Sequence, residues 1–270
     1  MPAEHAAILF LVIYALAAIG LVAWCIRRSG VEPVAWALYV VERIHVALFF
    51  HWRANRRSTI PANGPAIIIA NHRSPVDPML IWMNNHLGDR RGPIRIISFL
   101  MAREYYELRC LTWLFRAMRS IPVDRDGQDM RPAREALRRL KSGDVIGVFP
   151  EGRINTGQTG AELLPADPGV AWLALRSRLP VLPIYIHNSP CGSNMVAPFF
   201  TPARVFVCYG EPIDLSAYYD RRMTRELLDE VVALMMQRLA ETGRLAKLPA
   251  APESEAEEPP HIVPMHRAIG

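Results

Sequence analysis

The pattern of hydrophobic and polar positions begins with two apolar stretches. Residues 6–26 form a run of 21 residues without a charged side chain. As a helix this run is about 31 Å long, close to the thickness of the hydrocarbon core of a bilayer. Residues 33–52 are also apolar, but Glu42, Arg43 and His45 interrupt them. The pattern predicts a transmembrane helix at 6–26 and a helix at 33–52 that lies in or dips into the membrane interface.

Charges around the first run predict its orientation. Arg27 and Arg28 follow the run, so the chain beyond it is expected on the cytoplasmic face of the membrane. A cleaved signal peptide is less favoured, because Glu4 and His5 stand where a basic segment would be. For residues 33–52 a buried helix of a soluble domain is an alternative, since composition does not separate the two cases.

From residue 65 onward, short β-rich runs alternate with helix-like stretches. The runs expected to be strands are 66–70, 94–99, 145–149, 181–187 and 205–209. The stretches expected to be helices are 103–119, 131–141 and 224–242. This alternation predicts an α/β fold, with a mixed, mostly parallel sheet covered by helices on both faces. We therefore divide the chain into membrane-anchoring helices at 1–57, a folded domain at 58–246 and a disordered acidic, proline-rich tail at 247–270.

The composition of the chain limits the kinds of molecule that it is expected to bind. The chain has 270 residues, 51% of them hydrophobic, which is enough for a sizeable core. The net charge of +5 is spread along the chain without a basic block, which favours an anionic membrane or phosphorylated substrate over nucleic acid. The four cysteines form no C-x-x-C pair and are expected to be free thiols in a reducing compartment. The sequence specifies no oligomeric state.

The first candidate site follows the run at 66–70. His72 and Asp77 are five residues apart across a turn that contains Pro75. At this spacing the carboxylate can orient the imidazole and stabilise its charged form, and such an imidazole is the usual general base for a hydroxyl. A histidine at a strand end often only caps a helix, but the polar groups further along the chain favour the catalytic interpretation.

Polar residues also follow other expected strands. Residues 121–125 end in Arg125, and residues 149–153 bring Glu151, Gly152 and Arg153 to the end of a strand. Another short strand begins after Pro180. Because strand ends line the ligand crevice of open α/β sheets, these groups are expected to converge with His72.

Together, these four blocks resemble the glycerophospholipid acyltransferase superfamily, which includes 1-acylglycerol-3-phosphate and lysophospholipid acyltransferases. The family blocks are Asn-His-x4-Asp, Ile-Pro-Val-x-Arg, Phe-Pro-Glu-Gly and a short proline-containing strand. Here they correspond to residues 71–77, 121–125, 149–153 and 181–184, in the family order. The resemblance covers roughly residues 60–214, so the domain at 58–246 is expected to be an acyltransferase domain.

The resemblance implies transfer of an acyl chain from acyl-CoA or acyl carrier protein to a free hydroxyl of a membrane lysophospholipid or acylglycerol phosphate. His72 would be the general base and Asp77 its orienter. Arg125 and Arg153 are candidate phosphate clamps, because a guanidinium can bind phosphate in bidentate fashion. Glu151 belongs to a block associated with glycerol phosphate binding, and Gly152 would let the backbone approach the ligand. The direct attack of a hydroxyl needs neither a metal nor another cofactor.

Departures from the family pattern keep the expected substrate class broad. Arg153 stands one place earlier than the family arginine, as in 2-acylglycerophosphoethanolamine acyltransferases, and Asp167 replaces a frequent lysine. Arg119 and Ser120 stand where glycine is frequent. Alternatives are acylation of another lipid hydroxyl and a membrane lipid-binding protein without turnover. A hydrolase is the least favoured, since no Gly-x-Ser-x-Gly elbow is present.

Overall fold

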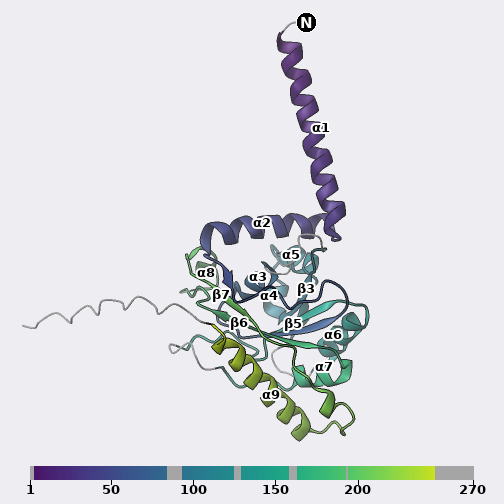
Figure 1. Ribbon diagram of the computed structural model, residues 1–270, viewed down its shortest axis with the longest axis vertical. Coiled ribbons are helices and arrows are strands. Elements are labelled where there is room, and N and C mark those ends of the chain that lie inside the picture. The colour runs from purple at the N-terminus through teal and green to yellow at the C-terminus, as the bar shows by residue number, and fades with distance from the viewer. Residues whose placement is uncertain (1–2, 84–92, 125–128, 158–162, 193, 247–270) are drawn as a thin grey trace, which may run out of the picture.

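The computed structural model describes residues 3–83, 93–124, 129–157, 163–192 and 194–246. It begins with helix α1 (Ala3–Ser29), which extends away from the rest of the protein, and helix α2 (Pro33–Phe49), which runs across one side of the domain (Figure 1). Gly30, with a φ of +72°, and Pro33 in the first turn of α2 make the sharp change of direction between them. The predicted tail at 247–270 lies outside the described residues, and the predicted domain boundaries stay predictions.

The two N-terminal helices differ in how they are covered. Within the described chain, α1 is the one helix long and apolar enough to cross a membrane, and its apolar window is fully exposed. One face of α2 is buried against the domain, whereas its other face exposes large apolar side chains, Val34, Val41, Ile44 and Leu48. The buried helix considered from the sequence describes one face of α2, and the membrane interface stays a prediction for the other face. Helix α2 ends at Phe49, before the predicted residue 52, because Phe50 is extended and bridges to Ala203.

A seven-stranded sheet forms the centre of the domain, in the order β1-β7-β6-β2-β5-β3-β4. Its strands are β1 (Arg53–Ala54), β2 (Ala66–Ala70), β3 (Ile97–Ala102), β4 (Ile121–Val123), β5 (Val145–Val148), β6 (Val181–His187) and β7 (Phe206–Tyr209). Only the β6–β7 pair is antiparallel among these described strands. The mixed, mostly parallel sheet predicted from the sequence is confirmed. The strand expected at 94–99 begins three residues later, because Ile94 donates its backbone N–H to Ser29 at the end of α1.

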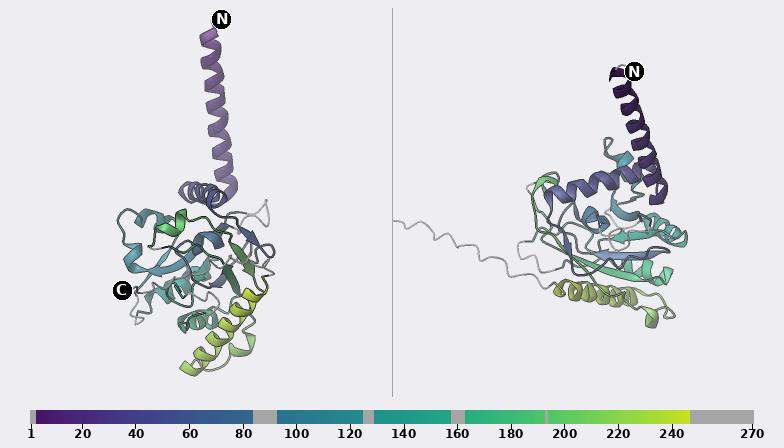
Figure 2. Two further views of the ribbon diagram at one scale, coloured as in Figure 1. Left: turned by 90° about the vertical axis from the view of Figure 1, so that its left-hand side faces the viewer. Right: turned by 45° about the horizontal axis from the view of Figure 1, so that its top comes forward.

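Helices cover both faces of this sheet (Figures 1 and 2). They are α3 (Asp77–Trp82), α4 (Arg103–Tyr106), α5 (Thr112–Ala117), α6 (Arg131–Lys141), α7 (Gly169–Ser177), α8 (Ala197–Phe200), α9 (Arg225–Arg244) and the 3₁₀ turn η2 (Ser216–Tyr218). The helix expected at 103–119 is two short helices, because a turn in which Leu111 donates to the Leu108 carbonyl separates them. The helix expected at 224–242 is α9, which Thr224 caps by accepting from the Leu227 N–H.

Strand β2 is central to both halves of the core. All five of its residues are buried, and its side chains alternate between the two faces. Ile68 packs with side chains of α2 and α3, whereas Ile67 and Ile69 pack with α6, α7 and α9. Since β2 lies between β5 and β6, the residues that follow it emerge in the middle of the carboxyl-terminal edge of the sheet.

Candidate active site

Asn71 fixes the end of β2. Its side-chain amide donates to the Ile186 carbonyl at 2.9 Å and its side-chain oxygen accepts from the Ile186 N–H at 2.7 Å. These two side-chain hydrogen bonds continue the pairing of β2 with β6 beyond the last backbone hydrogen bond between the two strands. His72 therefore begins its turn from a rigid position.

Asp77, in the first turn of α3, is fully buried and accepts four hydrogen bonds. Its Oδ2 accepts from the backbone N–H groups of Arg73 and Ser74, at 2.7 and 2.8 Å, and lies 3.0 Å from Nδ1 of His72. Its Oδ1 accepts from the Ser189 hydroxyl at 2.6 Å. A carboxylate is an acceptor only, so Nδ1 of His72 carries the proton and Nε2 holds the lone pair.

The imidazole of His72 is held from the side by an aromatic stack. Its ring lies 4.1 Å from the Phe149 ring, centroid to centroid and 15° from parallel, and Phe149 in turn stacks on Phe99 at 5.3 Å. Gly147 of β5 makes room for this stack, because a Cβ there would lie 2.3 Å from the Phe99 ring. Nε2 of His72 has no protein partner within the described chain, and the side chain is 17% exposed. The ring is oriented, and one nitrogen stays available.

Glu151 and Asn155 hold the backbone of His72 on both sides. Oε1 of Glu151 accepts from the His72 N–H at 2.9 Å, and the His72 carbonyl accepts from the Asn155 N–H at 2.7 Å. The second oxygen of Glu151 accepts from the Asn155 side-chain amide and from the Leu164 N–H. Both oxygens of this buried carboxylate are thus engaged by protein donors, which suits a positioning role better than direct contact with a ligand.

The structure brings His72, Asp77 and Glu151 together at one edge of the sheet. Gly152 continues the turn with a φ of +65°, and a Cβ there would meet nothing within 4 Å, so its backbone conformation is what favours glycine. Arg153 is exposed on the same turn and has no hydrogen-bond or ion-pair partner among the residues described. Arg125 lies outside the described residues, so its role as a phosphate clamp stays a prediction.

Sequence reasoning missed three groups of this site. The sequence pattern indicates only that Phe149 ends a strand, and it does not predict the contact of Asn155 with Glu151. Ser189 lies just beyond β6, which runs parallel to β2, so following that strand to its end would have located it at the same edge. No group of three or more metal-binding side chains occurs in the described part of the chain, and all four cysteines there are free.

A family model described as Acyltransferase matches residues 51–187, about half of the 270-residue chain and the whole stretch from β1 to the end of β6. The chain belongs to the acyltransferase family. The predicted resemblance to glycerophospholipid acyltransferases is confirmed, and the protein is an acyltransferase enzyme.

Known acyltransferases are similar to this chain in sequence and in fold. A 1-acyl-sn-glycerol-3-phosphate acyltransferase of Bacillus subtilis is 21% identical over 185 residues, which cover 68% of this chain and 84% of that protein. An N-acylphosphatidylethanolamine synthase of Arabidopsis thaliana is 30% identical over 133 residues, covering 47% of this chain and 44% of that enzyme. The crystal structure of the 1-acyl-sn-glycerophosphate acyltransferase PlsC of Thermotoga maritima has a TM-score of 0.57 and 23% identity, covering 90% of this chain and 98% of that one. The acyltransferase fold therefore extends over nearly the whole protein.

Proposed function

We propose that this acyltransferase moves a fatty acyl chain from acyl-CoA or acyl carrier protein to the free hydroxyl of a lysophospholipid or acylglycerol phosphate. The observation that carries the proposal is the pair of His72 and buried Asp77. Nδ1 of His72 lies 3.0 Å from Oδ2 of Asp77, and Nε2 is available to accept a proton. Two of the similar enzymes are named for acylglycerol phosphate, which supports an acceptor that carries a phosphate.

In the proposed reaction, Nε2 of His72 removes the proton of the acceptor hydroxyl as the oxygen attacks the thioester carbonyl. The carbon–oxygen bond forms, the carbon–sulfur bond breaks, and the imidazolium returns its proton to the leaving thiolate. The Asp77 carboxylate stabilises the imidazolium between the two proton transfers, and a positioned base of this kind contributes about 10²- to 10⁴-fold to the rate. Neither step requires a nucleophile from the protein.

Arg153 and Arg125 are the proposed phosphate ligands. Arg153 extends from the turn after Glu151, and Arg125 was predicted for the same role. A guanidinium favours a phosphate because it offers parallel N–H donors together with a full positive charge. Substitution of Arg153 by methionine is expected to raise KM for a phosphate-bearing acceptor more than it lowers kcat.

We also propose that α1 crosses a membrane and that the domain at 58–246 lies on its cytoplasmic face. Helices α2, α5 and α8 lie on the side of the domain from which α1 extends (Figure 1). All three expose large apolar side chains, among them Leu48, Trp113 and Phe200. Tryptophan and long apolar side chains of this kind favour the membrane interface. A domain held there meets acyl chains and lysolipids at a high effective concentration. Deletion of residues 1–30 is expected to release the protein from membranes without unfolding it.

The test of the reaction compares full-length wild type with His72→Ala, using acyl-CoA and acyl carrier protein as donors. The acceptors are a panel of lysophospholipids, lysophosphatidate and phosphatidylethanolamine, because one relative is named for an N-acylated form of the last. We expect His72→Ala to lower kcat about 10³-fold while the protein stays folded.

The matched control is His187→Gln, which changes another histidine at a strand end. Its Nε2 lies 2.9 Å from the Gly243 carbonyl on the far side of β6, and burial lowers the pKa of its imidazole. This variant is expected to keep most of the activity. Equal activity of wild type and His72→Ala would show that another group is the base, and selective acylation of an amine would replace the proposed acceptor.

A further inference from the structure

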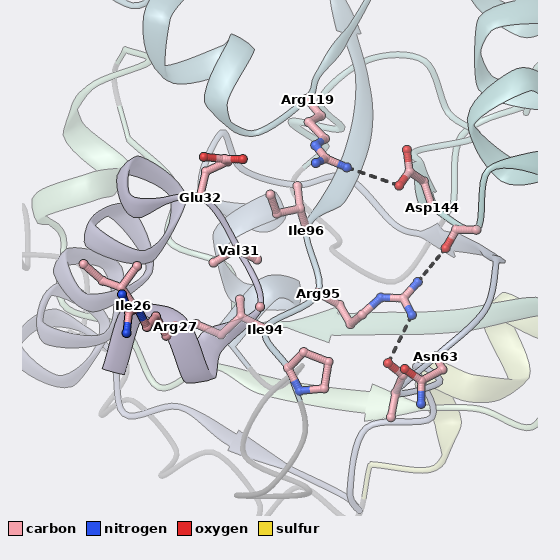
Figure 3. Close-up of a pocket in the computed structure, with 14 residues that line it drawn as sticks. Ile26, Arg27, Val31, Glu32, Asn63, Ile94, Arg95, Ile96, Arg119 and Asp144 are labelled. Carbon is pink, nitrogen blue, oxygen red and sulfur yellow. Dashed lines mark hydrogen bonds and ion pairs between the residues drawn. The ribbon is translucent and has the colours of Figure 1, made fainter. Parts of the chain in front are cut away.

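An open pocket of about 560 Å³ lies at the foot of α1 (Figure 3). It is lined by residues that precede β2, β3, β4 and β5, so it belongs to the amino-terminal edge of the parallel sheet. The charged residues that line it are Arg27, Glu32, Arg95, Arg119 and Asp144. His72 follows β2 at the opposite edge, so the pocket is distinct from the candidate active site.

Arg119 occupies this pocket at the expense of backbone strain. Its φ is +53°, the left-handed region that a glycine adopts without strain. Its guanidinium contacts Asp144 at 3.3 Å, and 51% of the side chain stays exposed.

Arg95 supplies a second fixed cation. Its guanidinium donates to the carbonyls of Ala62, Gly64 and Gly143, at 2.7 to 3.1 Å. These carbonyls are neutral, and burial lowers the pKa of the Arg95 guanidinium, although the charge of Asp144 opposes that change. Three guanidinium groups against two carboxylates leave the lining with a positive charge, which an anion can complement.

An apolar face of helix α1 lies next to this pocket. Its residues are Ala18, Ile19, Val22, Ala23 and Ile26, all from this one helix. Ile26 also lines the charged pocket. An amphiphile with its acyl chain along α1 would place a polar head group beside Arg27 and Arg119.

We propose that this pocket binds the phosphate of a membrane glycerophospholipid that is not a substrate and that holds the foot of α1 against the domain. The proposal rests on the proposed membrane crossing of α1, because that crossing places this apolar face of the helix among acyl chains. Arg27 and Arg119 are the proposed ligands of the phosphate, and Arg95 contributes positive charge from the floor of the pocket.

The experiment measures binding of radiolabelled phosphatidylglycerol to the full-length protein in a nonionic detergent, with diacylglycerol as the lipid that lacks a phosphate. Arg119→Gly removes the guanidinium and relieves the backbone, so this variant is expected to fold. We expect phosphatidylglycerol to bind it about fivefold more weakly than wild type, the effect of about one interfacial cation. Arg27→Gln is expected to show a loss of similar size.

Arg178→Gly is the matched control. Arg178 also has a left-handed backbone, with a φ of +54°, and pairs with one carboxylate, Asp220 at 2.8 Å, but it ends α7 away from the pocket. The Arg178→Gly variant is expected to bind phosphatidylglycerol with the same affinity as the wild type. Unchanged binding in Arg119→Gly, or equal binding of diacylglycerol by the wild type, would overturn the proposal.

Two further arms separate the sources of failure. Displacement of phosphatidylglycerol by millimolar glycerol 3-phosphate would show a site for soluble phosphates and overturn the lipid assignment. Flotation of the wild type on neutral phosphatidylcholine vesicles tests membrane attachment separately from the pocket. Without flotation the proposed anchoring fails, whereas flotation without selective phosphatidylglycerol binding refutes only the pocket. The His72→Ala variant is expected to bind the lipid normally, so a wrong reaction assignment leaves this result unaffected.

Discussion

The two edges of the parallel sheet hold opposite charges in opposite ways. At the carboxyl-terminal edge, the carboxylates of Asp77 and Glu151 each accept two backbone N–H groups from the loops that follow strands. At the amino-terminal edge, the guanidinium of Arg95 donates to three backbone carbonyls of the loops that precede strands. Asp77 and Glu151 are buried, whereas Arg95 is only partly buried. Charges that are withdrawn from water are stable only when such partners surround them. The loops at each edge thus select which charge the fold can hold there.

The edges differ also in what they leave available. Around His72 the buried carboxylates are saturated by protein donors, whereas Nε2 of the imidazole and the cation of Arg153 have no protein partner in the described part of the chain. Around Arg95 the pocket is open and carries a positive charge. The first arrangement suits a chemical step that needs one oriented base, whereas the second suits binding of an anion without chemistry. Substitutions at the carboxyl-terminal edge should therefore lower the rate of turnover, whereas substitutions of Arg95 at the amino-terminal edge should lower the stability of the fold.

The largest expected effect is that of Asp77→Asn at the carboxyl-terminal edge. Oδ2 of Asp77 accepts from two backbone N–H groups and from Nδ1 of His72, so asparagine is expected to keep its amide oxygen at this position. A neutral amide does not stabilise the imidazolium that forms when Nε2 takes the proton. We expect kcat for acyl transfer to fall about 10³-fold or more. Asp167→Asn is the control, since that exposed carboxylate bonds only the Gly169 N–H within the described chain. Retention of a tenth of the wild-type kcat in Asp77→Asn would contradict the proposed role of Asp77.

At the amino-terminal edge, Arg95→Met should act on stability. It leaves the carbonyls of Ala62, Gly64 and Gly143 without their charged donor, although the partly exposed loops allow water to replace some of the bonds. We expect the free energy of unfolding to fall by about 2 kcal/mol. Denaturant unfolding of the full-length protein in detergent measures this change. A loss below about 0.5 kcal/mol would mean that Arg95 does not hold the loops together.

A smaller effect is expected for Ser189→Ala, which removes one of the four donors to Asp77. Three donors remain, so the carboxylate should stay in place with a weaker hold on its orientation. We expect kcat to fall about tenfold, with an apparent KM close to that of the wild type. Ser189→Thr keeps the hydroxyl and is expected to restore most of the rate. Equal losses in both variants would indicate a packing defect instead of a lost hydrogen bond.

Ser189 also marks the boundary of what the sequence could predict. The His72–Asp77 pair is encoded by local spacing, and the alternation of strands and helices identified the fold, so both could be read from short windows. Ser189 is 112 residues from Asp77 and meets it only because β6 lies beside β2. Glu151 was placed at the correct edge, but its contact with the His72 backbone depends on how two loops pack. Contacts of this kind follow from strand order, which hydrophobic periodicity does not specify.

Helix α2 shows a similar limit and provides the smallest expected effect, at Glu42. From the sequence, Glu42 interrupts an apolar run; in the structure it is 6% exposed on the buried face of α2, and its Oε1 has no hydrogen-bond partner within the described chain. Burial raises the pKa of its carboxyl well above the usual range, so the folded state favours the protonated form.

Because the folded-state pKa is raised, the stability from this group is complete below the unfolded pKa and is lost as pH rises through the folded pKa. Glu42→Gln removes the titration. The variant should match wild type at acidic pH, within about 0.5 kcal/mol, and become more stable than wild type as pH rises. Thermal unfolding across a pH series, with Glu32→Gln on the exposed turn before α2 as control, measures the difference. Parallel pH profiles for wild type and Glu42→Gln would show that Glu42 does not carry its proton in the folded protein. Helix α2 would then bury a charged carboxylate whose Oε1 has no hydrogen-bond partner within the described chain, unlike the carboxylates of Asp77 and Glu151.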